Sequence, residues 1–320
     1  MVKILFFGLG SIGKRHARLI KQNYDSDLFA FRTNKGQEKN NLSIREFNNL
    51  DDAFEINPNI VFITNPTSIH IKTALKCAEK GIDMFIEKPL SNSMAGIEKL
   101  KGLVSQNNLF VYVGQCMRFH PVINYLKKNI EIQDILYAKT IATSYLPDWR
   151  PNQDYRNSYS VDPNKGGGIL LDLIHEIDYN YWLFGDIDKI SGKYGILSNL
   201  ESSSEDFAEL ILKFKTDIVG SIHLNWFSQN NERRIQIYCS NKYIEGDLVN
   251  NNVIIKEKNR GKKIIHFNLE RDDIYKAQLD YFFDAYSKRI VPMNEVSESA
   301  NILEKVFNFK KESEFINWRK

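Results

Sequence analysis

The amino-acid sequence predicts a two-domain α/β protein, with a parallel sheet in the first domain and a large, mostly antiparallel open sheet in the second. Three observations lead to this prediction. The chain has 320 residues, a length typical of two domains. Residues 1–118 alternate short apolar runs with helical stretches, the pattern of a parallel sheet covered on both faces. From residue 187 onward, a series of strands separated by hairpin signals predicts an antiparallel sheet.

Composition and charge limit the classes of partner. The chain is 42% hydrophobic and 26% charged, which is typical of globular proteins. Its net charge of +3 is dispersed along the sequence, which contains no basic block, so nucleic acid is not expected as a partner. No stretch approaches the roughly 20 apolar residues of a membrane helix. Cys77, Cys116 and Cys239 show no metal-binding spacing and fit a reducing cytoplasm without a bound metal.

The stretch KILFFGLGSIGKRH, residues 3–16, carries the most specific local signal. An apolar run, Ile4–Phe7, precedes Gly8, Gly10 and Gly13, which have the spacing G-x-G-x-x-G, and a helical pattern follows. A buried strand, a tight glycine turn and a helix N-terminus together provide backbone N–H groups for a pyrophosphate. We therefore expect a bound dinucleotide, contacted by Gly8, Gly10, Ser11, Ile12 and Gly13.

The end of the second strand indicates which dinucleotide is bound. In such folds an acidic residue there binds the ribose 2′-hydroxyl of NAD, whereas a basic residue accommodates the 2′-phosphate of NADP. The predicted strand Leu28–Arg32 ends in Arg32, which is followed by Thr33 and by no acid. Arg32 and Thr33 are thus expected cofactor contacts, and NADP is favoured over NAD. The alternative is that Arg32 is an ordinary solvated surface residue.

Two further predicted strands, Asn59–Thr64 and Asp83–Glu87, end in polar loops. Because ligands bind at the carboxyl ends of parallel strands, both loops should face the cofactor. The expected contacts are Thr64, Asn65, Pro66, His70, Glu87 and Lys88. Lys88 at a strand end could also hydrogen-bond a substrate oxygen, although a surface lysine paired with Glu87 would satisfy the same pattern.

In the second half, the segment Leu146–Lys165 is predicted to be a long loop rich in aromatic and basic residues. Loops of this length in compact domains are usually functional or disordered, and the aromatic content argues against disorder. Aromatic faces and guanidinium groups suit a sugar ring or a phosphate. Trp149, Arg150, Tyr155 and Arg156 are therefore candidate substrate contacts.

After three glycines, Gly166–Gly168, the apolar pattern predicts one helix over Ile169–Phe184. Asp172 and His175 lie three residues apart, so they should share a face of that helix, and Asp178 could orient the histidine ring. A histidine titrates near neutral pH and suits proton exchange with a hydroxyl. Each residue could instead be structural, because an acid in a first helical turn offsets the helix dipole and a histidine on an apolar helix is more often a satisfied core residue.

The remaining elements are strands followed by two helices. One face of the predicted sheet should pack on helices, and the other should meet a partner subunit, giving a homodimer or homotetramer. Helices are predicted over Asp272–Ser287 and Val296–Phe315, and the second is expected to return to the first domain. The strands are predicted over Phe207–Phe214, Ile218–Trp226, Arg234–Cys239, Tyr243–Leu248, Asn252–Lys256 and Lys263–Phe267.

Taken together, these motifs resemble the family of glucose–fructose oxidoreductase and inositol 2-dehydrogenase. The resemblance covers nearly the whole chain and implies a Rossmann domain over residues 1–118 and an α/β substrate and oligomerisation domain over residues 119–320. It also implies reversible hydride transfer between a nicotinamide and a sugar, a polyol or a related carbonyl compound. The motifs are the glycine loop, Thr64-Asn65-Pro66 with His70, Glu87-Lys88-Pro89, Arg118-Phe119, and Gly166-Gly167-Gly168 followed by Asp172 and His175.

By this resemblance Lys88, Asp172 and His175 form the catalytic set, and Arg118 joins the substrate contacts. His175 would take the proton from the substrate hydroxyl, and Lys88 would polarise the same oxygen. Many family members place the histidine four residues after the aspartate, whereas the spacing here is three. A His-Glu-x-x-Asp variant occurs in members that look like surface-polysaccharide enzymes. A sugar or sugar-nucleotide substrate is expected. The alternative is a dinucleotide-binding sensor of the same fold without catalysis.

Overall fold

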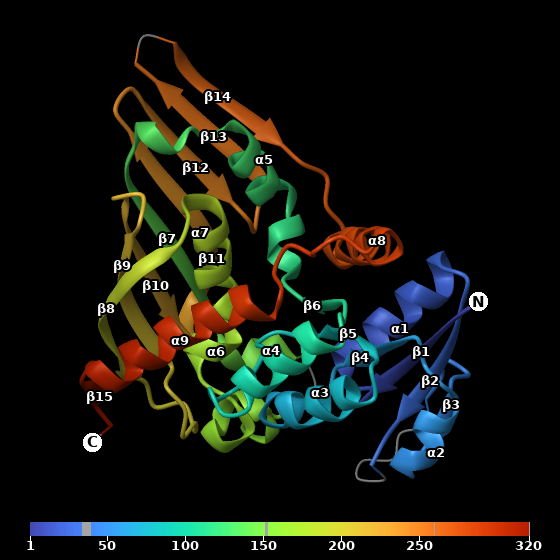
Figure 1. Cartoon of the computed structure of the whole chain (residues 1–320). Coiled ribbons are helices and arrows are strands. Elements are labelled where there is room, and N and C mark those ends of the chain that lie inside the picture. Colours follow the sequence, from blue (N-terminus) through green and yellow to red (C-terminus); the bar gives the residue numbers. More distant parts are fainter. Residues whose placement is uncertain (34–39, 151–152, 259, 320) are drawn as a thin grey trace. The chain divides into compact units, whose positions relative to one another are not determined.

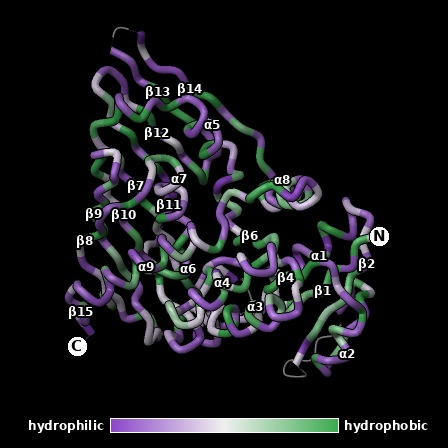
Figure 2. The backbone as a smooth tube through the Cα atoms, in the orientation of Figure 1, coloured by the Kyte–Doolittle hydropathy of each residue, from purple (hydrophilic) through white to green (hydrophobic). Residues whose placement is uncertain are grey.

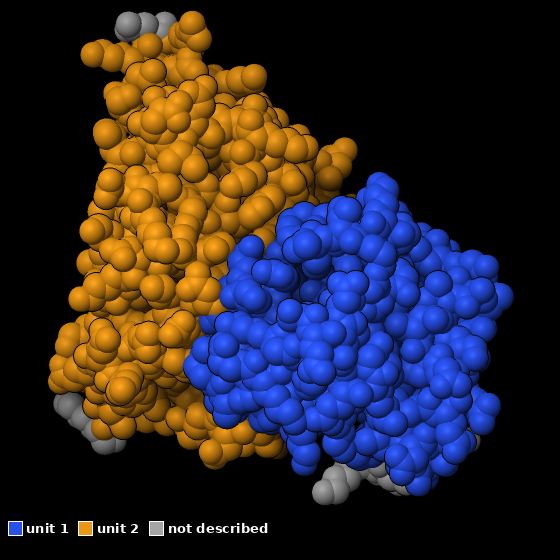
Figure 3. All heavy atoms as spheres, in the orientation of Figure 1, with its two compact units in different colours: residues 1–115, 275–300 blue, residues 116–274, 301–320 orange. Residues whose placement is uncertain are grey.

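The computed structural model describes residues 1–33, 40–150, 153–258 and 260–319. The chain forms two compact units, shown in different colours in Figure 3. The first unit combines residues 1–115 with residues 275–300, and the second combines residues 116–274 with residues 301–320. Each unit has its own sheet, as the sequence predicts.

The first unit contains a six-stranded sheet in the order β3-β2-β1-β4-β5-β6, and all of its strand pairs are parallel. This is the order of a doubly wound, dinucleotide-binding sheet. The strands are β1 (Val2–Phe7), β2 (Ser26–Phe31), β3 (Arg45–Phe47), β4 (Ile60–Ile63), β5 (Asp83–Ile86) and β6 (Val111–Val113). The helices between them are α1 (Ser11–Asn23), α2 (Leu50–Glu55), α3 (His70–Glu79) and α4 (Ile97–Gln106).

The central strands of this sheet are apolar along their length because helices cover both faces. Every residue of β4 is fully buried, as are Ile4, Leu5 and Phe6 of β1. Figure 2 shows hydrophobic residues along β1 and β4. This burial fixes the carboxyl ends of these strands, where the glycine loop and the loop after β4 begin.

A helix from the last third of the sequence completes the core of the first unit. It is α8 (Asp273–Lys288), and its Phe282 side chain is fully buried. The Phe282 ring lies 5.4 Å from that of Phe62 and 5.3 Å from that of Phe85, in edge-on geometry. The following helix, α9 (Val296–Glu312), belongs to the second unit from Asn301 onward.

The second unit contains a nine-stranded sheet in the order β14-β13-β12-β11-β7-β10-β9-β8-β15. All pairs are antiparallel except β7 with β10 and β8 with β15, so the sheet is mixed but mostly antiparallel. The strands are β7 (Ile135–Tyr145), β8 (Ile187–Ile196), β9 (Phe207–Phe214), β10 (Val219–Asn225), β11 (Phe227–Cys239), β12 (Lys242–Asp247), β13 (Asn252–Glu257), β14 (Gly261–His266) and β15 (Phe315–Asn317).

Helices pack on one face of this sheet (Figure 1). They are α5 (Pro121–Asn129), α6 (Ile169–Asp172) and α7 (Ile174–Phe184). A Cβ atom added to Gly246 of β12 would lie 2.7 Å from Val122 of α5, so the glycine allows close packing there. Asn180 of α7 donates to Thr140 of β7 at 2.9 Å, which fixes α7 on the centre of the sheet.

The end of the chain differs from the sequence prediction. The last helix was expected to run to Phe315, but α9 ends at Glu312, and Phe315 begins the edge strand β15. β15 pairs in parallel with β8, where Ile316 lies opposite Gly195. In the part of the chain that the structure describes, no helix is both long and apolar enough to span a membrane.

Candidate functional site

The glycine loop connects β1 to α1 in the first unit. Gly8 has a φ of +94°, a conformation that favours glycine, and its N–H donates to the carbonyl of Phe31 at 3.1 Å. A Cβ atom on Gly13 would lie 2.5 Å from the oxygen of Gly8, so only glycine fits there. The loop is thereby closed against the start of α1.

The geometry of this loop suits a pyrophosphate. A Cβ atom on Gly10 would have nothing within 4 Å, so the backbone there faces open space. Gly10 is the N-cap of α1 and supplies no side-chain cap, and the first turn of α1 contains no acidic residue. Helix geometry leaves the N–H groups of Ser11, Ile12 and Gly13 without intrahelical acceptors, which suits an anion.

The loop after β4 lies against the glycine loop. The Thr64 hydroxyl donates to the carbonyl of Gly8 at 2.7 Å, and the Asn65 side chain donates to the hydroxyl of Thr73 at 2.9 Å. Pro66 is exposed, and it precedes a short 3₁₀ turn that leads into α3. The structure thus brings the predicted residues Gly8, Thr64 and Asn65 together at one edge of the sheet.

The turn after β5 carries Lys88, with a cis peptide bond between Lys88 and Pro89. Glu87 is buried, and its Oε1 atom lies 2.6 Å from Nε2 of His16 on α1. His70, at the start of α3, lies 2.9 Å from the carbonyl oxygen of Pro89 through Nδ1. The side chains of Glu87 and His70, both expected to contact the cofactor, are therefore engaged within the first unit.

Arg32 follows β2, as expected, but its guanidinium has a protein partner. Nη1 lies 2.8 Å from Oε1 of Glu46, which belongs to β3, and the Arg32 side chain is 17% exposed. Asn40 donates to the same carboxylate oxygen at 2.5 Å. The next residue, Thr33, is exposed. A carboxylate thus stands beside the arginine that was predicted to select the cofactor.

In the second unit, the predicted helix over residues 169–184 breaks at Leu173, which separates α6 from α7. Asp172 is the last residue of α6, and His175 is the second residue of α7. The expectation that both share one face of a single helix is therefore wrong. Asp172 is 2% exposed, whereas the His175 side chain is 12% exposed.

The three glycines before α6 hold the long loop against it. A Cβ atom on Gly167 would lie 2.3 Å from the carbonyl oxygen of Tyr159, and one on Gly168 would lie 2.6 Å from the carboxylate of Glu205. The N–H of Gly168 donates to the carbonyl of Ser160 at 3.0 Å. The start of α6, which leads to Asp172, is therefore packed closely against its neighbours.

His175 lies beside an ion pair whose carboxylate, on Glu176, has no exposed surface and whose arginine, Arg233, is 27% exposed. Oε1 of Glu176 lies 2.7 Å from Nη2 of Arg233 on β11 and 3.2 Å from Nε2 of His175, and Arg233 lies 2.5 Å from the same ring nitrogen. Tyr179 donates to the other carboxylate oxygen of Glu176. Burial raises the pKa of Glu176, but Arg233, His175 and Tyr179 outweigh it and lower the pKa to about 2. The carboxylate therefore stays ionised next to the imidazole.

Asp178, the residue expected to orient His175, makes a second buried ion pair on α7. Arg118 donates to it through two nitrogens, at 2.8 and 2.7 Å, and the side chains of Arg118 and Asp178 are 1% and 0% exposed. Bidentate geometry of this kind is the strongest form of the arginine–carboxylate contact. Arg118 thus lies inside the second unit and supports α7.

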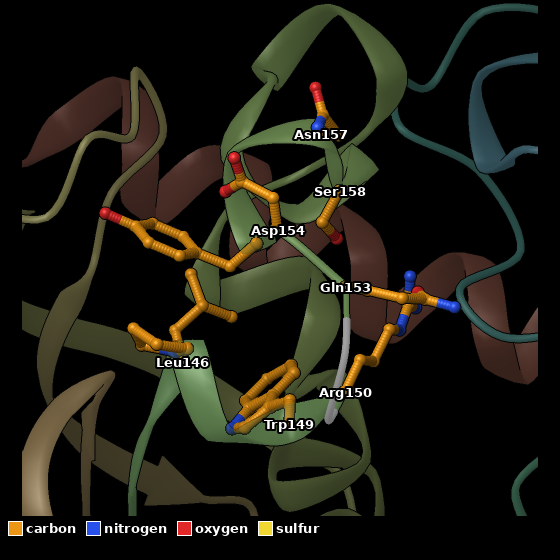
Figure 4. A pocket seen from close by; sticks show the side chains of 9 residues that line it. Leu146, Trp149, Arg150, Gln153, Asp154, Asn157 and Ser158 are labelled. Atoms are coloured by element: carbon orange, nitrogen blue, oxygen red, sulfur yellow. The ribbon is translucent and has the colours of Figure 1, made fainter.

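The long loop of the second unit forms short 3₁₀ helices, η4 (Leu146–Trp149), η5 (Tyr155–Asn157), η6 (Tyr159–Val161) and η7 (Pro163–Lys165). It lines a partly open cavity of about 280 Å³. Pro151 and Asn152 of the predicted loop lie outside the described residues. The lining residues are Leu146, Pro147, Trp149, Arg150, Gln153, Asp154, Tyr155, Asn157 and Ser158 (Figure 4).

Two aromatic residues of this cavity are held in place by hydrogen bonds. The indole of Trp149 donates to Ser144 at 2.8 Å, and the hydroxyl of Tyr155 accepts from the N–H of Glu201 at 3.0 Å. Arg150 and Gln153 extend to the same side of the cavity in Figure 4. Arg156, by contrast, is paired with Asp154 at 2.8 Å. Of the predicted substrate contacts, Trp149, Arg150 and Tyr155 line the cavity.

Sequence reasoning missed several residues of these clusters. Glu176 and Arg233 are 57 positions apart, and no local pattern connects them. The histidine beside Glu87 could have been found, because His16 follows Gly13 by three residues and so shares its helix face. Among residues 1–33, 40–150, 153–258 and 260–319, no group of His, Cys, Asp and Glu side chains is placed to hold a metal ion.

The parallel sheet and its glycine loop define a dinucleotide-binding protein of the Rossmann type. Matches to known protein families agree with this fold and add its function. Residues 2–115 match the oxidoreductase family with an NAD-binding Rossmann fold, and residues 132–245 match the GFO/IDH/MocA C-terminal domain. The chain belongs to the Gfo/Idh/MocA family of oxidoreductases.

Several relatives extend along most of the chain. The chain is 25% identical to myo-inositol 2-dehydrogenase of Thermotoga maritima over 299 residues, which cover 88% of this chain and 87% of that protein. It is 24% identical to UDP-N-acetylglucosamine 3-dehydrogenase of Acidithiobacillus ferrooxidans over 257 residues, which cover 79% of this chain and 76% of that protein.

Solved structures share the fold over nearly the whole length. UDP-N-acetylglucosamine 3-dehydrogenase from Acidithiobacillus ferrooxidans superposes with a TM-score of 0.82 at 20% identity, covering 98% of this chain and 97% of the other. Levoglucosan dehydrogenase in complex with NADH superposes with a TM-score of 0.85 at 17% identity, covering 98% of both chains. At these identities the likeness establishes the fold.

Proposed function

We propose that this protein transfers a hydride between a nicotinamide cofactor and a hydroxyl or keto carbon of a sugar or sugar nucleotide. The observation that carries the proposal is a partly exposed imidazole, His175, held beside the ion pair of Glu176 and Arg233 in a chain that also has a pyrophosphate cradle. Hydride transfer to or from an alcohol carbon requires a matching proton transfer at its oxygen. The named activities of the relatives, inositol and UDP-sugar dehydrogenation, agree with this chemistry.

In this proposal the bound nicotinamide accepts or supplies the hydride, and three side chains serve the substrate. His175 exchanges the proton of the reacting hydroxyl. The ammonium group of Lys88 stabilises the charge that develops on the substrate oxygen. Asp172, a buried carboxylate, binds a neighbouring hydroxyl.

The cavity of the long loop is our candidate for the remainder of the substrate. The faces of Trp149 and Tyr155 suit a sugar ring, and the cavity also offers the guanidinium of Arg150 and the amide of Gln153. Arg150 is the better candidate for a phosphate contact, because the charge of Arg156 is already balanced by Asp154. A nucleotide-linked sugar of surface-polysaccharide synthesis would use both kinds of contact.

We infer that NADP is the preferred cofactor, with NAD as the alternative. The position of Arg32 at the end of β2 supports this inference, since a 2′-phosphate would lie there. The carboxylate of Glu46, 2.8 Å from Arg32, opposes it, since it repels a phosphate and balances the guanidinium charge. Cofactor preference thus depends on the balance between these two side chains.

We also propose that the protein is cytoplasmic and forms homodimers or homotetramers through the open sheet. Strand residues on the face away from α5, α6 and α7 include Ile211, 50% exposed, and Tyr238, 40% exposed. Exposed apolar side chains on a sheet suit contact with a second copy. Sedimentation of the wild type and of Ile211→Lys tests this: a stable oligomer in the wild type and dissociation of the variant are expected.

The test of the catalytic proposal is a substrate screen. The purified protein is mixed with NADP or NAD and a panel of polyols, free sugars and UDP-sugars, and reduced nicotinamide is measured by absorbance. Turnover of at least one sugar compound is expected, together with a large loss of kcat in His175→Ala and Lys88→Ala. Tight cofactor binding without turnover of any panel member would instead support the non-catalytic sensor.

A further inference from the structure

The side chain of Glu87 is tied into the first unit through both of its oxygens. Oε1 lies 2.6 Å from Nε2 of His16, and Oε2 accepts the backbone N–H of Lys88 at 3.1 Å. Glu87 is only 8% exposed. The carboxylate therefore connects α1, which begins at the glycine loop, to the backbone of the residue proposed to stabilise charge on the substrate.

His16 is placed for this contact by the helix period. It follows Gly13 by three residues, so both face the sheet, and it is fully buried. Its ring centre lies 5.0 Å from that of Phe85 and 5.9 Å from that of Phe62. Nδ1 has no hydrogen-bond partner among the described residues. Because a carboxylate oxygen only accepts, a neutral His16 carries its proton on Nε2 and donates it to Glu87.

His70 holds the other end of the same turn. Its Nδ1 lies 2.9 Å from the carbonyl oxygen of Pro89, and its Nε2 lies 2.8 Å from the carbonyl oxygen of Asn65. His70 is 2% exposed. Both partners are carbonyl oxygens, and a neutral ring carries one N–H, so His70 donates to one of them and packs against the other. The ring lies between the turn after β5 and the loop after β4, each of which ends a central strand of the sheet.

We propose that His16 and His70 are positioning residues that clamp the turn Glu87-Lys88-Pro89 from its two ends. The clamp fixes the Lys88 backbone relative to the glycine loop through α1, and relative to Asn65 through α3. The effect of the clamp on catalysis rests on the proposed function of Lys88. The clamp itself involves only residues of the first unit. A merely space-filling role for either histidine would require its shape but not its hydrogen bonds.

Hydrogen–deuterium exchange measured by mass spectrometry on the protein without added cofactor tests the clamp. His16→Leu keeps most of the volume but has no donor, whereas His16→Gln keeps an N–H donor near the position of Nε2. We expect peptides covering residues 84–92 to exchange about tenfold faster in His16→Leu than in the wild type, and His16→Gln to restore most of the protection. His70→Leu should also accelerate exchange in these peptides and in those around Asn65.

His120→Leu is the matched control, since His120 is also a buried histidine, 3% exposed, but belongs to the second unit. It should lower global stability without changing exchange at the turn. A folded His16→Leu variant with wild-type exchange over residues 84–92 would overturn the clamp. So would equal acceleration in His16→Leu and His16→Gln, because shape alone would then explain the effect.

A second measurement needs no folded leucine variant. Nitrogen-15 NMR of histidine-labelled wild-type protein reports which ring nitrogen carries the proton. The signal that is lost in His16→Gln is assigned to His16. We expect a proton on Nε2 of His16, and a neutral ring with its only proton on Nδ1 would overturn the clamp. Neither measurement involves turnover, so absence of activity toward every sugar would refute the proposed function while leaving the clamp supported or refuted on its own data.

Discussion

The guanidinium of Arg233 lies 2.7 Å from the carboxylate of Glu176, a side chain with no exposed surface. His175 contacts both members of this ion pair. Removing one partner of a buried pair leaves the other charge without compensation, which is more costly than the pair itself is favourable. The stability of the second unit and the environment of the proposed proton acceptor are therefore linked.

Arg233→Met should lower the free energy of unfolding by roughly 3 kcal/mol at neutral pH, because it leaves the buried Glu176 carboxylate without its partner. The Arg233 side chain is 27% exposed, which places the loss at the lower end of the range for buried pairs. Urea unfolding followed by tryptophan fluorescence measures this. The neighbouring Arg234 is the control: its side chain is 38% exposed, and its closest carboxylate contacts are 3.5 and 3.6 Å away. Arg234→Met should cost at most about 1 kcal/mol. Equal losses in both variants would contradict the proposed importance of this ion pair.

The pH dependence of stability should show a contribution from His120. Burial, followed by the nearby Arg233, lowers the pKa of His120 to about 4 from 6.5. The folded protein thus takes up this proton less readily than the unfolded chain. The contribution of His120 to the free energy of unfolding is fully present above pH 6.5. It is lost as the pH falls toward 4, and the total loss is roughly 3 kcal/mol. The lowered pKa of His70 acts with the same sign.

Unfolding free energies measured across this pH range test the contribution. The decrease on acidification should be smaller in His120→Gln than in the wild type. His266 is an exposed histidine of the same unit, so His266→Gln serves as the reference and should preserve the wild-type slope. An unchanged slope in His120→Gln would show that the buried imidazole is not a source of the acid sensitivity.

Two glycines of the cofactor loop should respond differently to the same added methyl group. Gly10→Ala places a Cβ atom in open space, so the free energy of unfolding should change by less than about 1 kcal/mol. The methyl group would nevertheless occupy the surface that a pyrophosphate approaches, and cofactor affinity should fall at least about tenfold. Fluorescence titration with NADPH and NADH measures this affinity.

Gly13→Ala places its Cβ atom 2.5 Å from the oxygen of Gly8 and 2.7 Å from the hydroxyl of Thr64, so something must shift. This variant should lose both stability, by roughly 1–3 kcal/mol, and cofactor affinity. If Gly10→Ala bound both nucleotides as the wild type does, the loop would not be the pyrophosphate site.

Cofactor preference should depend on Arg32 and Glu46 in opposite senses. Arg32→Gln should weaken NADPH binding by about tenfold and leave NADH binding nearly unchanged, since only NADPH carries the 2′-phosphate. Glu46→Gln removes the carboxylate 2.8 Å from Arg32 and should strengthen NADPH binding severalfold. If the wild type preferred NADH and Arg32→Gln left both affinities unchanged, Arg32 would be a structural partner of Glu46 alone.

The parts of the fold that local sequence encodes could be predicted. The apolar run before Gly8 and the glycine spacing specify strand, turn and helix within a few residues, and alternating patterns specify the strands of the second sheet. The break at Leu173 could not be predicted, since residues 169–184 contain neither glycine nor proline and their apolar pattern is continuous. The short elements β3 and α2 were likewise missed.

The contacts made by the candidate residues were harder to predict than their identities. Arg118 was expected at the substrate but binds Asp178 inside the protein, because a folded chain satisfies a buried guanidinium with a carboxylate wherever topology supplies one. Glu87 was expected at the cofactor, but its oxygens are engaged by His16 and the Lys88 backbone. Such pairs join residues distant in sequence, and a single sequence does not show which groups become neighbours.

The position of Phe282 in the core of the first unit has a consequence for synthesis on the ribosome. The nucleotide-binding sheet is complete once residue 115 has been made, but Phe282 is missing until most of the chain has been translated. Until then the rings of Phe62, Phe85, Phe110 and Tyr112 lack the side chain that covers them. Nascent chains that have not reached α8 should therefore expose an aromatic surface of the kind that chaperones recognise, and the first unit should become protease-resistant only late in translation.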